Sequence, residues 1–168
     1  MIDLKGEKMN DCKILITGAT GVIGQALIRK IRKEYSNVCI IAMVRNKDRA
    51  IKLFGEESED FIYLVGDVCS IIPEELDIDY IIHGASQTSS RAFINEPVET
   101  IMTAFQGTKN MLDIAKLSNV KGFIYLSSME VYGIPSTDEK IDETHCTDLD
   151  TMKVRSCYPE SKRMCESL

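Results

Sequence analysis

Short apolar runs alternate with more polar stretches along this sequence. The runs are rich in isoleucine, leucine and valine, and their length is typical of β-strands. One of them, VCIIAMV, is apolar throughout, as expected for a strand that is covered on both faces of a parallel sheet. We therefore expect five strands, at residues 13–17, 38–44, 61–68, 79–86 and 122–128.

The stretches between these runs carry apolar residues at helical spacing. One helix follows the first glycine turn, a charged helix is expected over Lys47–Phe54, and Pro97 can open a longer helix that ends near Leu117. A further helix starts at Tyr158. Strands that alternate with helices predict an α/β fold, a doubly wound parallel sheet of the Rossmann type. The polar stretch 133–157 lacks periodicity, and we interpret it as a long loop across the carboxyl edge of the sheet.

Length and charge narrow the class of protein. The 168 residues fit one domain, because domains average roughly 150 residues. We expect an N-terminal extension at residues 1–12 and one domain at residues 13–168, incomplete at its C-terminal end. The net charge of −6 comes without a basic stripe, which argues against a nucleic-acid partner. The N-terminus is too polar for a signal peptide and no apolar run approaches the ~20 residues that cross a bilayer, so we expect a cytoplasmic protein without a membrane partner.

The cysteines do not suggest a metal site. They form no Cys-x-x-Cys pair, and the two histidines do not cluster with them at ligand spacing. This pattern predicts reduced thiols and no bound metal. The six cysteines are Cys12, Cys39, Cys69, Cys146, Cys157 and Cys165.

The turn TGATGVIG lies between the first expected strand and the first expected helix. Glycines at this spacing permit a tight turn, close approach of the backbone to a pyrophosphate and close helix packing, while the helix end adds amide donors. This context favours a dinucleotide site over a merely structural turn. The residues expected to contact the cofactor here are Gly18, Thr20, Gly21, Val22, Ile23 and Gly24.

The end of the second strand bears on the choice of cofactor, NADP or NAD. Arg45 lies there and favours NADP, because an arginine at this place can meet the 2′-phosphate. Asp48, three residues later, keeps NAD open, since a carboxylate can hold the ribose 2′-hydroxyl. The alternative for Arg45 is a solvated residue at a strand end.

The ends of the third and fourth strands supply the remaining cofactor candidates. Asp67, followed by Val68, either reaches the adenine ring or begins a turn. His83 has no evident partner for acid-base chemistry, and we interpret it as a hydrogen-bonded packing residue. The residues after it are small enough for a cofactor to lie against their backbone, namely Gly84, Ala85 and Ser86.

Three residues in the last part of the chain form the expected catalytic set. Tyr158 and Lys162 are four residues apart and therefore share one face of a helix. A lysine cation beside the phenol, together with a positive nicotinamide, favours the phenolate, which is the form that accepts a proton. Ser127 and Ser128 end the fifth strand, which adjoins that helix in a βαβ sheet. A hydroxyl, a phenol and an ammonium can thus converge beside the nicotinamide.

With TGATGVIG, HGAS, GTKNMLDIAK, SSMEVYG and YPESK in this order, the chain resembles the extended short-chain dehydrogenase/reductase family, and within it the NAD-dependent epimerase/dehydratase group that acts on nucleotide sugars. The resemblance runs from about Lys13 to Leu168. It implies that Tyr158 takes a proton from a sugar hydroxyl while the adjacent carbon gives hydride to the nicotinamide. It also implies that Lys162 holds the nicotinamide ribose and that Ser128 hydrogen-bonds the reacting oxygen.

Two positions depart from the patterns of this family. Ala104 stands where many members have an asparagine, so one polar contact near the active site is missing. Met129 stands where dehydratases have an aspartate, and a methionine cannot donate the proton that elimination needs. Glu130 is left as a candidate base, although a solvated loop glutamate is the simpler interpretation.

The resemblance predicts an NAD(P)-dependent epimerase or reductase whose substrate is a nucleotide sugar. A catalytically silent NAD(P)-binding regulatory module is the alternative from another class, and an atypical dehydratase is the third. Members of the family usually continue beyond the Tyr158 helix, so we expect a truncated fold that lacks the C-terminal substrate domain. They also commonly form homodimers, which here implies pairing through the helix near Pro97 to Leu117 and the Tyr158 helix.

Overall fold

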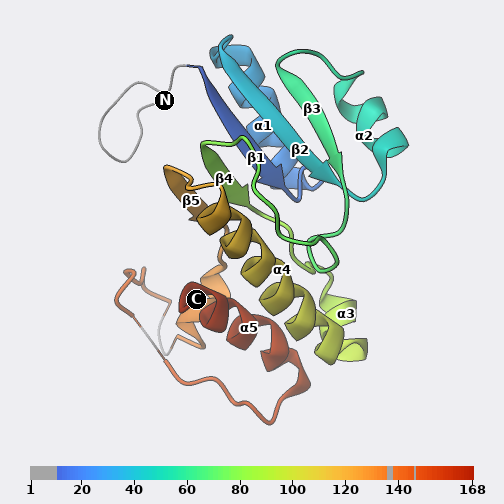
Figure 1. Cartoon of the computed structure of the whole chain (residues 1–168). Coiled ribbons are helices and arrows are strands. Elements are labelled where there is room, and N and C mark those ends of the chain that lie inside the picture. The colour runs from blue at the N-terminus through green and yellow to red at the C-terminus, as the bar shows by residue number, and fades with distance from the viewer. Residues whose placement is uncertain (1–10, 136–137, 146) are drawn as a thin grey trace. The chain divides into compact units, whose positions relative to one another are not determined.

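A computed structural model describes residues 11–135, 138–145 and 147–168 of the chain (Figure 1). The expected extension at residues 1–12 therefore lies outside the described residues except for its last two, and Cys146 also lies outside them. The chain divides into two compact units. The first comprises the residues up to Ala85 together with Thr108–Leu126, and the second comprises Ser86–Gly107 and Ser127–Leu168.

Strands and helices alternate in the first unit, as the sequence pattern predicted. The last three residues of three expected strands, at 66–68, 84–86 and 126–128, lie beyond the strand ends, because the backbone turns out of the sheet there. The elements are β1 (Cys12–Thr17), α1 (Val22–Glu34), β2 (Val38–Val44), α2 (Lys47–Phe54), β3 (Phe61–Val65), β4 (Tyr80–His83), the second half of α4 (Pro97–Leu117) and β5 (Gly122–Tyr125).

The five strands form one parallel sheet in the order β3-β2-β1-β4-β5 (Figure 1). The chain runs outward from β1 through β2 to β3, and then crosses back to form β4 on the other side of β1. The strand order thus reverses between β1 and β4, and in open α/β sheets ligands bind in the crevice outside the carboxyl ends of the strands at such a point. The predicted doubly wound parallel sheet is confirmed.

Apolar side chains cover both faces of this sheet, because successive residues of a strand point to opposite sides. Ile14 and Ile16 of β1 pack in one cluster with residues of α1 and α2, including Ile28 and Phe54. Leu15 of β1 points the other way, and its cluster includes Met111 and Ile114 of α4. Full burial of one such side chain stabilises the fold by about 1.5–3 kcal/mol. The unbroken apolar character of β1 and β2 thus reflects cores on both faces.

The second unit consists of short helices. Ser89 caps α3 by accepting a hydrogen bond on its Oγ from the Ala92 amide, at 3.4 Å. The sequence pattern did not predict α3 or the two single-turn helices, because such short elements show no helical periodicity. The last helix begins at Cys157, one residue before the predicted start. The elements are α3 (Ser90–Asn95), the first half of α4, the 3₁₀ helices η1 (Met129–Tyr132) and η2 (Val154–Ser156), and α5 (Cys157–Glu166).

Candidate functional site

The turn at the end of β1 requires glycine for steric reasons at two positions. Gly18 has φ of 68°, in the left-handed region, and a Cβ on it would lie 2.6 Å from the carbonyl carbon of Gly84. A Cβ on Gly24 would lie 2.3 Å from the carbonyl oxygen of Gly18. The Gly21 amide donates to that same oxygen at 2.9 Å and closes the turn. The turns after β1 and β4 therefore touch through their backbones.

The first turn of α1 has the features of an anion site. Gly21 is its N-cap, no side chain caps the amides that follow, and no acidic residue lies in the first turn. Val22 is 88% exposed and Ile23 is also exposed, so the surface above these amides is open. Thr20 helps to fix the turn, since its carbonyl accepts a hydrogen bond from Gln25 Nε2 at 2.9 Å. Amides at a helix start lack intrahelical partners and favour negative charge.

The turn after β4 is held by the end of β1. Thr17 Oγ1 accepts hydrogen bonds from the amides of Gly84 and Ala85, at 3.1 and 3.0 Å. His83 Nδ1 lies 2.7 Å from the same oxygen, so the interpretation of His83 as a hydrogen-bonded packing residue is confirmed. Ser86, the next residue, belongs to the second unit, where its Oγ donates to the carbonyl of Gln87 at 3.4 Å.

Arg45 and Asp67, both predicted to contact the cofactor, face each other at the ends of β2 and β3. Arg45 Nη1 lies 3.8 Å from Asp67 Oδ2, and both side chains are exposed. Asp67 also begins a turn, as one of its two interpretations proposed, because its Oδ1 accepts from the Cys69 amide at 2.8 Å. Val68 is buried, and its carbonyl accepts from Asn110 Nδ2 at 2.8 Å. The ends of β2 and β3 thus carry a pair of opposite charges.

The three predicted catalytic residues all belong to the second unit. Lys162 Nζ lies 6.0 Å from the ring centroid of Tyr158, one turn away on α5. The Tyr158 ring stacks on Phe93 of α3, with the centroids 4.3 Å apart and an interplanar angle of 15°. Ser128 caps η1, and its Oγ accepts a hydrogen bond from the Glu130 amide at 3.2 Å. The amide uses only a lone pair of the Ser128 oxygen, so the hydroxyl keeps its own proton, which it can donate to a reacting oxygen.

Arg163 fastens α5 to the turn that Ser128 begins. Its Nε donates to the carbonyl of Val131 at 2.7 Å, and its Nη2 donates to the carbonyl of Thr147, also at 2.7 Å. Thr147 in turn donates from its Oγ1 to the carbonyl of Tyr132 at 2.6 Å. The helix that carries Tyr158 is thereby attached to η1, and the Ser128 hydroxyl lies at the start of η1.

Glu130 is not the solvated loop glutamate that the sequence suggested. Both of its oxygens accept from the guanidinium of Arg155, which binds it in a bidentate manner with Nη2 to Oε1 at 2.9 Å. Arg155 also lies over the ring of Phe93, 5.5 Å from its centroid. Sequence reasoning missed Arg155 and Phe93 because neither stands in a motif and their partners lie far away in the sequence.

Lys162 is the buried charge of this set, at 3% exposure. Burial lowers the pKa of its ammonium, and the smaller opposing influences of Cys165 and Glu166 do not offset that effect. The unfolded chain therefore binds this proton more tightly than the folded chain. The free energy of unfolding must rise as the pH increases through the folded pKa towards 10.5, the ordinary value.

We expect Lys162→Met to raise the free energy of unfolding by about 1 kcal/mol, because it replaces a buried charge, which is costly to desolvate, with an apolar side chain of similar length. The variant should also lose the rise of stability with pH. Denaturant unfolding at several pH values measures both effects, and Lys33→Met, at an exposed site on α1, is the control. Equal pH profiles for the wild type and Lys162→Met would show that the ammonium is not destabilised.

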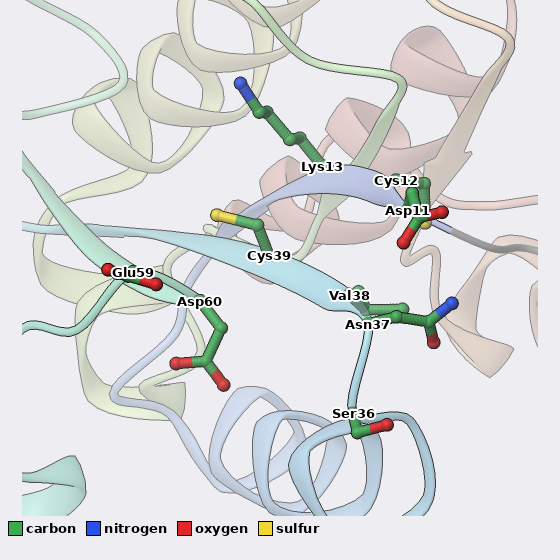
Figure 2. A pocket seen from close by; sticks show the side chains of 9 residues that line it. All are labelled: Asp11, Cys12, Lys13, Ser36, Asn37, Val38, Cys39, Glu59 and Asp60. Carbon is green, nitrogen blue, oxygen red and sulfur yellow. The ribbon is translucent and has the colours of Figure 1, made fainter.

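The pocket in Figure 2 lies at the opposite edge of the sheet, around the amino ends of β1, β2 and β3. Lys13 and Cys39 line it from neighbouring strands (Figure 2). Burial raises the pKa of the Cys39 thiol and of the Cys12 thiol, which keeps both protonated and weakly nucleophilic. None of the predicted site residues lines this pocket. It is therefore separate from the crevice at the carboxyl ends of the strands.

Two kinds of feature, metal-binding clusters and membrane-spanning helices, are absent from the described part of the chain. Within residues 11–135, 138–145 and 147–168, no three or more His, Cys, Asp or Glu side chains are grouped so that they could hold a metal ion. No helix in those ranges combines the length and the apolar character needed to cross a membrane.

Comparison with known proteins matches nearly the whole chain. The model of the NAD dependent epimerase/dehydratase family matches residues 14–168. The chain is 32% identical to UDP-glucuronic acid decarboxylase 4 of Arabidopsis thaliana, over 97% of this chain and 36% of that protein. It is 30% identical to UDP-glucuronic acid decarboxylase 1 of Danio rerio, over 93% of this chain and 36% of that protein. The chain thus spans little more than a third of the length of these relatives.

Solved structures share the fold. UDP-N-acetylglucosamine 4-epimerase from Methanobrevibacter ruminantium superposes with a TM-score of 0.78 at 21% identity, over 95% of this chain and 49% of that one. UDP-glucose 4-epimerase from Bifidobacterium longum, solved with NAD+ and UDP, superposes with a TM-score of 0.71 at 22% identity, over 92% of this chain and 47% of that one. At these identities the likeness concerns the fold alone.

Proposed function

Because this chain belongs to the NAD dependent epimerase/dehydratase family, we propose that its first unit binds a nicotinamide dinucleotide and that Ser128, Tyr158 and Lys162 act on a nucleotide sugar. The observation that carries the proposal is the contact between the Gly18 and Gly84 turns at the switch point of the sheet. A side chain on Gly18 would collide with the backbone of Gly84, so the close approach of the two turns depends on glycine. The exposed, uncapped amides of α1 stand beside it.

The cofactor, when bound, supplies the hydride acceptor. Tyr158 removes the proton from a sugar hydroxyl, and the Ser128 hydroxyl donates a hydrogen bond to the same oxygen. Lys162 holds the ribose and stabilises the phenolate, which returns a counter-charge to the buried ammonium. Phe93 holds the plane of the Tyr158 ring by stacking. In this proposal each residue thus contributes a hydrogen bond, a charge or an orientation.

The substrate proposed is a UDP-sugar. The curated relatives are named UDP-glucuronic acid decarboxylases, and the similar solved structures are UDP-sugar 4-epimerases. Epimerisation can proceed by removing and returning hydride at a carbinol. If the sugar bears a carboxylate one carbon from the new ketone, the resulting β-keto acid loses CO₂ instead. Proton removal by Tyr158, with hydride transfer to a bound nicotinamide, could therefore begin either reaction, and decarboxylation joins epimerisation and reduction as a candidate.

Elimination is the reaction that this site supports least. Met129 has no proton to donate, and both oxygens of Glu130 are already engaged by Arg155. An assay that follows nicotinamide absorbance and sugar products with UDP-glucose and with UDP-glucuronic acid separates the reactions. A new UDP-hexose epimer identifies an epimerase, and a UDP-pentose with CO₂ identifies a decarboxylase. Bound cofactor without any sugar product identifies a silent binding module.

The assignment of Arg45 to the 2′-phosphate remains a prediction. We expect NADP to bind at least as tightly as NAD, and Arg45→Ala to weaken NADP about tenfold while leaving NAD unchanged, because only NADP carries the phosphate. Asp67→Asn is the matched variant, since it keeps the side-chain size but removes the negative charge 3.8 Å from the guanidinium. Titration calorimetry with both cofactors measures the effects. A preference for NAD that Arg45→Ala leaves unchanged would refute the role of Arg45.

We also propose that two copies of the chain pair through α4 and α5. Apolar side chains of the first half of α4 are exposed, among them Val98, Ile101 and Met102. An exposed apolar face of this kind typically marks an interface. We expect sedimentation to show a dimer that Met102→Lys dissociates. A monomer at high concentration for the wild type would contradict the pairing.

A further inference from the structure

The layer formed by α1 and α2 is the basic part of the first unit. Both helices cover the same face of the sheet, since Ile28 and Ile31 of α1 share one apolar cluster with Ala50 and Phe54 of α2. Residues 25–54 contain eight lysines and arginines but only two acidic residues, which gives a net charge of +6 in a chain whose net charge is −6. The positive charge of the chain is therefore concentrated on this layer.

Five exposed cations of this layer, which we call the basic patch, form no ion pair within the part of the chain that the structure describes. They are Arg29, Arg32, Lys33, Arg49 and Lys52. On α1 these cations are spaced by three and four residues, and like charges at that spacing destabilise a helix by about 0.2–0.5 kcal/mol per pair. The arrangement thus does not serve the stability of the helix, and its field favours an anionic partner.

Arg32 joins the cations of the two helices into one surface. Its Nη1 donates to the carbonyl of Phe54 at 2.9 Å, and its guanidinium lies over the ring of Phe61, 4.9 Å from the centroid. Phe54 is the last residue of α2, so a cation of α1 lies at the carboxyl end of its neighbour. This contact fixes the guanidinium at the junction of the two helices.

An acidic cluster borders the basic patch. The stretch EESED follows directly after Gly55, the C-cap of α2, and its four acidic residues are exposed. Glu57 is used inside the chain, because it pairs with Lys47 at 2.5 Å and accepts from the Tyr63 amide at 2.9 Å. The other three carboxylates, which we call the acidic cluster, pair with no lysine or arginine of the described residues. They are Glu56, Glu59 and Asp60.

We propose that a second copy of this chain docks on this surface about a two-fold axis, with the basic patch of each copy against the acidic cluster of the other. A two-fold contact uses one surface twice, so two neighbouring regions of opposite charge satisfy both halves of it. The second copy supplies the anions that the basic patch lacks and the cations that the acidic cluster lacks. This pairing is independent of the proposed function and of the pairing through α4 and α5.

Salt should weaken the pairing, because it joins exposed charges. The screening length falls from about 10 Å at 0.1 M salt to about 3 Å at 1 M. We expect sedimentation of the wild-type chain to show a self-association that is about tenfold weaker at 1 M than at 0.05 M salt. The pairing through α4 and α5 is apolar and should not weaken with salt. The salt-sensitive step therefore reports on the α1–α2 surface.

Charge reversal tests the two regions separately. Arg49→Glu/Lys52→Glu makes the whole surface negative, and Glu56→Lys/Glu59→Lys makes it positive. Each variant alone should lose the salt-sensitive step, because like charges then face each other. A 1:1 mixture of the two should regain it, since a negative surface then meets a positive one. Lys116→Glu, at an exposed cation on α4, is the control and should associate like the wild type.

Loss in each variant together with recovery in the mixture supports the proposal, and the recovery also shows that both variants are folded. A wild-type mass that does not change with salt overturns the proposal, as does a mixture that stays dissociated. A wild-type chain that does not self-associate at low salt but binds RNA or anionic lipid vesicles through Arg49 and Lys52 also overturns it, because the basic patch then serves another polyanion.

Discussion

Tyr158→Phe is expected to abolish turnover of the nucleotide sugar, with a loss at or above the range of about 10²–10⁴-fold that general acid-base groups contribute. The substitution removes only the hydroxyl that exchanges the proton. The ring and its stacking on Phe93 at 4.3 Å remain, so the local fold of the second unit should be unchanged. Cofactor affinity should also be nearly unchanged, since the pyrophosphate is proposed to lie on the glycine turn. Stopped-flow reduction of bound cofactor by the sugar nucleotide measures the loss.

Two variants on α5 separate the role proposed for Lys162 from that of Arg163. Lys162→Ala should lower both turnover and cofactor affinity, because its ammonium is proposed to stabilise the phenolate and to hold the ribose. Arg163→Lys keeps a cation but removes the fork that reaches Val131 and Thr147, and it should lower turnover without changing cofactor affinity. A Tyr158→Phe protein that reduced its cofactor at the parental rate would place the acid-base group elsewhere.

Gly18→Ala is expected to destabilise the chain by about 2–5 kcal/mol and to eliminate dinucleotide binding. The left-handed backbone at φ of 68° costs a non-glycine residue about 1–2 kcal/mol. The new Cβ would also lie 2.6 Å from the Gly84 backbone, which cannot move aside cheaply, and such overpacking adds about 1–3 kcal/mol. Denaturant unfolding and cofactor titration measure the two losses.

Gly55→Ala is the matched control for this substitution. Gly55 also has positive φ, at 91°, but nothing lies within 4 Å of the place where its Cβ would be. It should therefore lose only the about 1–3 kcal/mol of backbone strain, with full cofactor affinity. Similar losses in the two variants would mean that the close approach of the Gly18 and Gly84 turns does not matter.

The strands of the sheet and the motifs at its carboxyl edge could be predicted from the sequence alone. Runs such as VCIIAMV gave the strands because a strand between two helical layers must be apolar on both sides. The glycines at 18 and 24 could be recognised from the sequence because the backbone conformation of Gly18 and the close contacts at both positions exclude other residues. The resemblance to the epimerase/dehydratase group rested on the same motifs, and the family match over residues 14–168 confirms it.

The contacts around Tyr158 could not be predicted from the sequence, because they join residues without a fixed spacing. Phe93 stacks on Tyr158 from a six-residue helix, too short to show a period. Arg155 binds Glu130 across 25 positions in the chain, and without that partner the glutamate was wrongly interpreted as solvated. Long-range pairs of this kind depend on the fold and leave no local pattern.

An amide NMR titration of the 168-residue chain with NAD and NADP shows whether a dinucleotide binds at the glycine turn. We expect saturable shifts at the amides of Val22, Ile23 and Ala85, around the turns that touch at the carboxyl ends of β1 and β4. Shifts confined to the pocket at the amino ends of the strands, around Cys39 and Asp60, would contradict it, as would no shift with either dinucleotide.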